Sequence, residues 1–187
     1  MGISKKIWFI ILLLTAQLSW GITYLKINGV DSNFTLVQGD TLEWKADCDT
    51  GGTLIAEIWI DLNKNHQVEA DKDKPLYVGF SVIDGDTTEE QGPPDMDGQK
   101  NGEVLFRVPI GLAPAYYIFL FYDPSDSSQV LNWGQVTPLP NPVRVVTGKV
   151  NGPAGLEPVN ILIQAETDSE DIGADTWMAL TDSNGVY

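Results

Sequence analysis

Short apolar runs, broken by glycine, proline, asparagine and aspartate, recur along most of this chain. Residues 41–45 (TLEWK) alternate polar and apolar positions, as a strand with one buried face does. Residues 56–60 (AEIWI) and 116–122 (YYIFLFY) are more continuously apolar and indicate more deeply buried strands. The predicted strands cover residues 23–27, 42–46, 54–61, 76–83, 102–108, 115–122, 143–150 and 159–165. Short strands at this spacing predict an all-β fold built as a β-sandwich.

The first 21 residues follow a different pattern. Lys5 and Lys6 precede the apolar run 7–14 (IWFIILLL), and the small residues Ser19 and Gly21 come three and one positions before a cut at 21/22. The pattern predicts a signal peptide over 1–21 and a secreted or cell-surface protein. The apolar run is short for a bilayer span, although an N-terminal membrane anchor stays open as an alternative.

Composition narrows the class of partner. The formal charge of the 187 residues is −15, and losing the two lysines of the signal makes it −17. Such a surface repels nucleic acids and anionic membranes and suits divalent cations. No second long apolar stretch follows, so we expect no membrane span after cleavage. The expected partner is an extracellular protein or a glycan, which the sequence does not identify.

The sequence predicts no enzyme. The motifs GxSxG and HExxH, the P-loop and the dinucleotide fingerprint are all absent from it. Cys48 is the only cysteine, so it forms no internal disulfide, and we expect it to act as a small buried hydrophobic residue. A catalytic thiol would need His66, the only histidine, which lies in a loop with another expected role.

Prolines at positions 138, 140 and 142 stiffen the chain and mark a linker. The predicted domains are therefore a β-sandwich over 22–142 and the start of a second over 143–187. The end, TDSNGVY, reads as a turn followed by the first residues of a strand. We expect the chain to be a fragment of a longer protein, the alternative being a terminus on an edge strand.

Alternating oxygen-bearing side chains follow the strand at 54–61. The candidate cation ligands are Asp61, Asn63 and Asn65, the backbone carbonyl of Gln67, and Asp71. Oxygen ligands at positions 1, 3, 5 and 7 of a loop converge on hard cations such as Ca²⁺, so calcium is the expected cofactor. Glu69 and Asp73 are further carboxylates that would complete the shell.

The same loop departs from an EF-hand. His66 stands where a glycine is usual, so it must adopt a strained turn conformation, and Lys72 stands at the twelfth position in place of glutamate. A strand also precedes the loop where an EF-hand has a helix. The alternative is a hairpin turn whose side chains bond their own backbone. Zinc is disfavoured, because His66 has no second histidine or cysteine beside it.

Two other features are candidates for binding. The acidic segment 84–103 includes the run Asp95–Gly98, which is either a second cation loop or part of a long exposed loop. Aromatic side chains stack on sugar rings. Trp44 and Trp59 lie in strand patterns and are expected in the core, whereas Trp133 and Trp177 are more available.

Residues 58–79 (IWIDLNKNHQVEADKDKPLYVG) resemble the GEVED-type extracellular domain of bacterial secreted proteins. Residues 104–123 (VLFRVPIGLAPAYYIFLFYD) are similar to the later strand pair of that family. The signature itself would fall in 132–140 (NWGQVTPLP), where Gly134 and Val136 match and Gln135, Thr137 and Pro138 depart. The resemblance spans about 22–145 and implies an immunoglobulin-like β-sandwich accessory module, with its Asp/Asn loop at Asp61, Asn63 and Asn65.

Residues 148–165 (GKVNGPAGLEPVNILIQA), followed by 181–187 (TDSNGVY), resemble the carboxypeptidase-regulatory-like, or collagen-adhesin B-type, domain. Thr181, Asp182, Gly185 and Tyr187 fit its Thr-Asp-x-x-Gly-x-Tyr motif. This resemblance implies a partial prealbumin-like β-sandwich over 143–187.

The expected fold is therefore all-β, with an immunoglobulin-like sandwich and a partial prealbumin-like sandwich after an N-terminal signal helix. The expected function is a non-catalytic extracellular binding or spacer module of a larger protein, stabilised by calcium. Two alternatives stay open. One is an accessory region of an exported peptidase or glycoside hydrolase, and the other is a carbohydrate-binding module.

Overall fold

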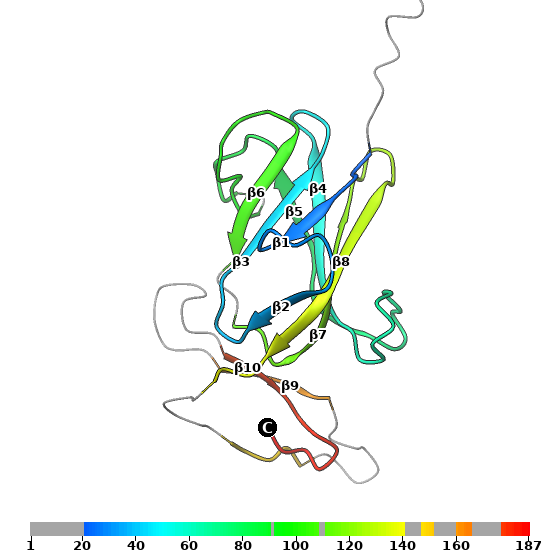
Figure 1. Cartoon of the computed structure of the whole chain (residues 1–187), viewed down its shortest axis with the longest axis vertical. Coiled ribbons are helices and arrows are strands. Elements are labelled where there is room, and N and C mark those ends of the chain that lie inside the picture. The colour runs from blue at the N-terminus through cyan, green and yellow to red at the C-terminus, as the bar shows by residue number, and fades with distance from the viewer. Residues whose placement is uncertain (1–20, 91, 109–110, 141–146, 152–159, 166–176) are drawn as a thin grey trace, which may run out of the picture.

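The computed structural model describes residues 21–187 except 91, 109–110, 141–146, 152–159 and 166–176 (Figure 1). Most of the predicted signal segment thus lies outside the described residues. The described part is all-β. Its strands are β1 (Leu25–Ile27), β2 (Phe34–Val37), β3 (Leu42–Asp47), β4 (Thr53–Ile60), β5 (Lys74–Ile83), β6 (Glu103–Val108), β7 (Ala115–Tyr122), β8 (Gln129–Thr137), β9 (Leu162–Ala165) and β10 (Trp177–Leu180). Across those described segments, no helix has the length and apolarity that crossing a membrane requires.

Two sheets make up the first part of the chain. The larger sheet has the strand order β2-β8-β7-β4-β5, and the smaller has the order β1-β3-β6. Neighbouring strands are antiparallel except β2 and β8, which run parallel with Phe34 opposite Gly134. A Cβ at Gly134 would lie 2.2 Å from the carbonyl oxygen of Phe34, so this close pairing requires glycine.

The core lies between the inner faces of these two sheets. Trp44 on β3 is fully buried, stacks on Phe106 of β6 at 5.4 Å, and meets the edge of Phe119 on β7 at 4.7 Å. Alternate residues of β3 and β4 are buried, as a strand with one core-facing side requires. The architecture is therefore β-sandwich-like, and the prediction that Trp44 belongs to the core is confirmed.

Most predicted strands are present, and three further strands among the described residues were missed. The strands β1, β3, β4, β5, β6 and β7 fall within a few residues of six predicted ranges, and β9 falls within 159–165. The missed strands are β2 and β8, both in the larger sheet, and β10, which pairs with β9. The predicted strand 143–150 lies partly outside the described residues, and Lys149 within it forms an isolated bridge with Val186.

The described end of the chain packs against the first part. β9 and β10 pair antiparallel and lie beyond one end of the larger sheet (Figure 1). Met178 of β10 is buried, and its carbonyl oxygen accepts a hydrogen bond from Nε2 of Gln38 at 3.2 Å. The predicted turn within TDSNGVY is also present, because Oδ1 of Asp182 accepts the backbone N–H groups of Asn184 and Val186.

Candidate functional site

The predicted cation loop connects β4 to β5 and projects from the larger sheet (Figure 1). It begins at Asp61, whose backbone N–H donates to the carbonyl oxygen of Tyr116 on β7 at 2.9 Å. The Asp61 residue is only 2% exposed. The first candidate ligand is therefore fixed by the sheet before the loop leaves it.

The Asp61 carboxylate organises the first turn of the loop. Its Oδ1 accepts the backbone N–H of Asn65 at 3.2 Å, and its Oδ2 accepts that of His66 at 3.0 Å. The imidazole Nδ1 of His66 lies 3.3 Å from the same Oδ2. The backbone of His66 has φ of 62° and that of Lys64 has φ of 59°. The left-handed conformation predicted at His66 is therefore confirmed, and Asp61 holds it.

The Glu69 carboxylate binds the side chains of both Asn63 and Asn65. The Nδ2 groups of Asn63 and Asn65 donate to Oε2 of Glu69 at 2.6 and 2.5 Å. Their Oδ1 atoms accept backbone N–H groups two residues further on, from Asn65 at 3.0 Å and Gln67 at 2.9 Å. Nζ of Lys72 lies 2.6 Å from Oε1 of Glu69, and this hydrogen bond is the largest cause that lowers the Glu69 pKa.

Asp73 closes the loop at its other end. Its Oδ1 accepts the backbone N–H of Leu62 at 3.2 Å, and its Oδ2 accepts that of Glu69 at 2.8 Å. Asp73 is 6% exposed, whereas Asp71 is exposed and no described hydrogen bond joins it to the other candidates. The structure thus brings Asp61, Glu69 and Asp73 into one hydrogen-bonded loop and leaves Asp71 outside it.

The donor set of this loop is made of carboxylate and carboxamide oxygens, which suit a hard cation such as Ca²⁺. Asp61, Asn63 and Asn65 are brought together as predicted, with Glu69 beside them at position nine, where such loops place a further ligand. The oxygens nonetheless face backbone N–H groups, so the self-bonded hairpin turn is present too. Among the described residues, no three His, Cys, Asp or Glu side chains converge as a metal-binding group.

The loop also touches aromatic residues of the sheet. The imidazole of His66 stacks on the indole of Trp133 with ring centroids 3.7 Å apart, and Nζ of Lys64 lies 4.5 Å from the ring centroid of Tyr116. Trp133 belongs to β8 and is half-buried. Trp59 is half-buried on the outer face of β4, so its predicted place in the core is wrong. The Trp177 side chain lies outside the described part of the structure.

The acidic segment 84–103 contains two buried carboxylates rather than a wholly exposed loop. Asp84 is 0% exposed and accepts the backbone N–H groups of Gly51, Asn101 and Gly102 at 2.6, 3.2 and 3.0 Å. Asp95 is 1% exposed and accepts those of Gly85 and Leu105 at 2.8 and 3.1 Å. These carboxylates stabilise the backbone of the segment, because buried N–H groups require acceptors.

Cys48 packs against the core and is half-buried. Burial first, and then the negative charges of Asp84 and Asp47, raise the pKa of its thiol to about 12. A thiol in this environment stays protonated at neutral pH and is a poor nucleophile.

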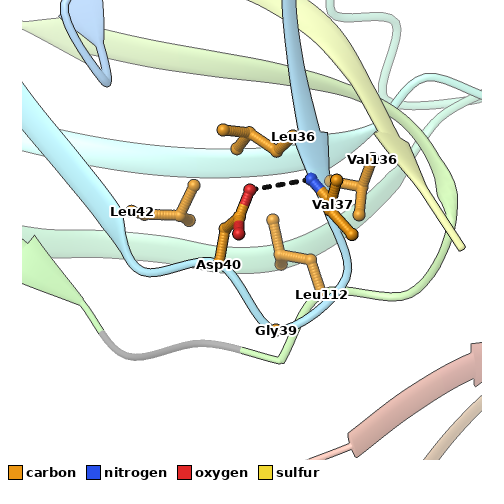
Figure 2. Close-up of a pocket in the computed structure, with 7 residues that line it drawn as sticks. All are labelled: Leu36, Val37, Gly39, Asp40, Leu42, Leu112 and Val136. Carbon is orange, nitrogen blue, oxygen red and sulfur yellow. Dashed lines mark hydrogen bonds between the residues drawn. The ribbon is translucent and has the colours of Figure 1, made fainter. Parts of the chain in front are cut away.

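Figure 2 shows a small depression between β2, β3 and β8. Leu36, Val37, Gly39, Asp40, Leu42, Leu112 and Val136 line it. Its empty volume, open solvent included, is about 160 Å³, which is below the range of small-molecule pockets. The Asp40 carboxylate accepts the backbone N–H of Val37 at 2.8 Å and so stabilises the turn after β2.

No protein-family model matches this chain, and no curated protein matches it either.

Proposed function

We propose that this chain is a non-catalytic extracellular module, an immunoglobulin-like β-sandwich whose loop 61–73 binds Ca²⁺. The loop carries the proposal, because Glu69 binds the side-chain amides of Asn63 and Asn65, and the carboxylates of Asp61 and Asp73 hold the backbone of the same loop. Within the described contacts of the loop, Lys72 offsets part of that charge through its ion pair with Glu69. A bound calcium ion would neutralise the remaining charge and lock the loop.

In the proposed site each residue has one role. The carboxylates of Asp61 and Glu69 supply charge, and the amide oxygens of Asn63 and Asn65 supply neutral ligands. The backbone carbonyl of Gln67 follows at position seven. Asp73 stabilises the loop through the N–H groups of Leu62 and Glu69. Its role would be to keep the ligand oxygens close together.

Export is proposed from the signal sequence, and the start of the fold supports it. Ile22, the first residue after the predicted cut, is 8% exposed and belongs to the hydrophobic core. Its backbone N–H donates to Oγ of Ser128 at 3.2 Å. Cleavage at 21/22 would therefore leave the described sandwich intact.

The absence of catalysis is proposed on the state of the reactive groups. Cys48 has a raised thiol pKa of about 12. The buried carboxylates of Asp84 and Asp95 accept backbone N–H groups, which is a structural role. The proposal that 143–187 begins a prealbumin-like sandwich rests on its motif residues and on the pairing of β9 with β10. The alternative of an accessory region in an exported enzyme places catalysis in another part of that protein.

The test of the calcium site is thermal melting of the purified chain in excess Ca²⁺ and in chelator. A ligand that binds only the folded state at about 100 times its Kd adds about 2.7 kcal/mol to the free energy of unfolding. We expect Ca²⁺ to raise the Tm of the wild type and of Asp71→Asn, and to leave the Tm of Asp61→Asn unchanged. Equal melting of the wild type in both buffers would remove calcium from the proposal.

A further inference from the structure

The chain that follows the predicted cut is held by the fold from its first residue. Ile22 is 8% exposed and belongs to the core, and its backbone N–H donates to Oγ of Ser128 at 3.2 Å. The Asp47 carboxylate accepts the backbone N–H groups of Thr23 at 2.8 Å and Tyr24 at 3.0 Å. The Ile22 nitrogen is therefore held in place by residues that remain after the proposed cleavage.

A carboxylate lies at the same point, on the turn between β7 and β8. Figure 1 shows the start of the described chain beside this turn. A Cβ built on Gly21 would lie 3.3 Å from Oδ2 of Asp126 and 2.9 Å from Oγ of Ser128. Oδ1 of Asp126 accepts the backbone N–H of Ser128 at 2.7 Å, which holds the carboxylate in the turn. The space around Gly21 is thus bordered by one negative charge and one hydroxyl group.

Hydrolysis of the peptide bond between Gly21 and Ile22 would change the charge at this point. Water adds across the bond, so Gly21 leaves as a carboxylate and Ile22 keeps an amino group. An α-amino group has a pKa of about 7.7–8.0 and is mostly protonated at neutral pH. One of the new N–H bonds takes the direction of the broken bond, so it points into the space that Gly21 leaves beside Asp126.

We propose that cleavage at 21/22 creates an ion pair between the α-ammonium of Ile22 and the carboxylate of Asp126. Oγ of Ser128 accepts a second hydrogen bond from the same ammonium. The inference rests on the proposed export and cleavage of the chain. It makes the removal of the signal a step that stabilises the fold, because the precursor has an uncharged amide at this position.

The arrangement favours this pair over an ordinary surface ion pair. Exposed pairs are weak largely because two long side chains must be held in one geometry. Here the cation is the end of a backbone that Asp47 already holds, and the anion is a short side chain bonded to Ser128. Asp47 itself already accepts three hydrogen bonds from Thr23 and Tyr24, which leaves Asp126 as the partner of the ammonium.

The experiment is a double-mutant cycle in thermal melting, run in chelator so that the proposed calcium site makes no contribution. One chain begins at Ile22 and is released from a fusion by a protease that leaves no extra residue. The other begins at Thr15, which places the ammonium seven residues before Ile22. Asp126→Asn keeps an acceptor oxygen for Ser128 and removes the charge. We expect it to lower the Tm of the first chain by about 1–3 °C and to leave that of the second nearly unchanged.

Asp71→Asn is the matched control, because Asp71 is exposed and its substitution changes the net charge equally. Added salt should reduce the effect of Asp126→Asn on the first chain, since it screens an exposed pair. The proposal is overturned if Asp126→Asn lowers the Tm of both chains alike, or lowers that of the first chain no more than Asp71→Asn does.

Mass spectrometry of the exported protein tests the cleavage separately. We expect an N-terminus at Ile22. A different N-terminus would overturn the proposed cleavage and, with it, this role of Asp126. An N-terminus at Ile22 without the expected difference in Tm would overturn the ion pair alone and leave the proposed export standing.

Discussion

The imidazole of His66 lies flat on the indole of Trp133, with an interplanar angle of 11°. His66 belongs to the loop that follows β4, whereas Trp133 lies on β8, and β7 separates β8 from β4 in the sheet. The stack fastens the tip of the loop across the sheet, while Asp61 fastens its base. Aromatic pairs of this kind contribute about 0.5–1.5 kcal/mol beyond the area that they bury.

Two substitutions at His66 separate the effect of the aromatic stack on stability from the effect of the backbone strain. Ala at this position loses the stack and keeps φ near 62°, whereas Gly loses the stack but adopts that conformation without a steric penalty. We expect His66→Gly to have a free energy of unfolding about 1 kcal/mol higher than His66→Ala. Urea denaturation followed by tryptophan fluorescence measures both. A His66→Ala variant as stable as His66→Gly would show that the strain at His66 is not significant.

The strands that the sequence predicted best have apolar, buried residues at every second position. β3 alternates because Leu42, Trp44 and Ala46 all enter the core. β8 was missed because its inward positions include Asn132, which is buried, and Gly134, which the close approach of Phe34 requires. Polar residues and glycine at such positions read as a loop. β2 was missed as well, because it is short and its parallel partner is remote in sequence, with no hairpin turn to mark the pair.

The candidate loop was only partly predictable for a related reason. Spacing alone placed Asp61, Asn63 and Asn65 together, because neighbouring positions of one tight turn are always close. Whether Glu69, Asp71 or Asp73 joins them depends on how the loop returns to β5, which spacing does not determine. In the same way, the alternation in β4 located Trp59 in a strand without showing that it faces outward.

Asn132 should be a sensitive position for stability. Its Nδ2 donates to the carbonyl oxygens of Leu25 at 3.0 Å and Val30 at 2.7 Å, which joins β8 to the first segment of the smaller sheet. Asn132→Leu would leave both acceptors without this donor, and each such loss costs about 1–3 kcal/mol. We expect a clear fall in the urea midpoint, and little change for Gln129→Leu, an exposed site on the same strand. Similar midpoints for the two variants would contradict this role.

Asp84 is expected to hold the segment 84–103 through its charge-assisted hydrogen bonds. Asp84→Asn replaces one acceptor oxygen by an NH₂ group that faces backbone donors, so at least one of its three bonds is lost. A loss of about 2–3 kcal/mol is expected. Asp86→Asn is the control, since Asp86 is only half-buried and its carboxylate bonds only Thr88 among the described contacts. Thermal melting measures the loss of stability in each variant. An equal loss in both would argue against the buried Asp84 carboxylate as the group that organises the segment.

Cys48 should make the fold sensitive to alkaline pH. Burial and nearby carboxylates raise the pKa of its thiol from 9.0 to about 12, so above about pH 9 the thiol ionises in the unfolded chain but not in the folded one. The unfolded state then binds fewer protons than the folded state, and stability falls as pH rises from about 9 towards 12. The raised pKa values of Tyr24 and Tyr117, both caused first by burial, act in the same direction.

The Cys48→Ala variant removes only the contribution of the thiol to this pH dependence. We therefore expect the wild type to lose free energy of unfolding faster than Cys48→Ala between pH 8 and 10.5, whereas parallel curves would mean that the thiol ionises alike in both states.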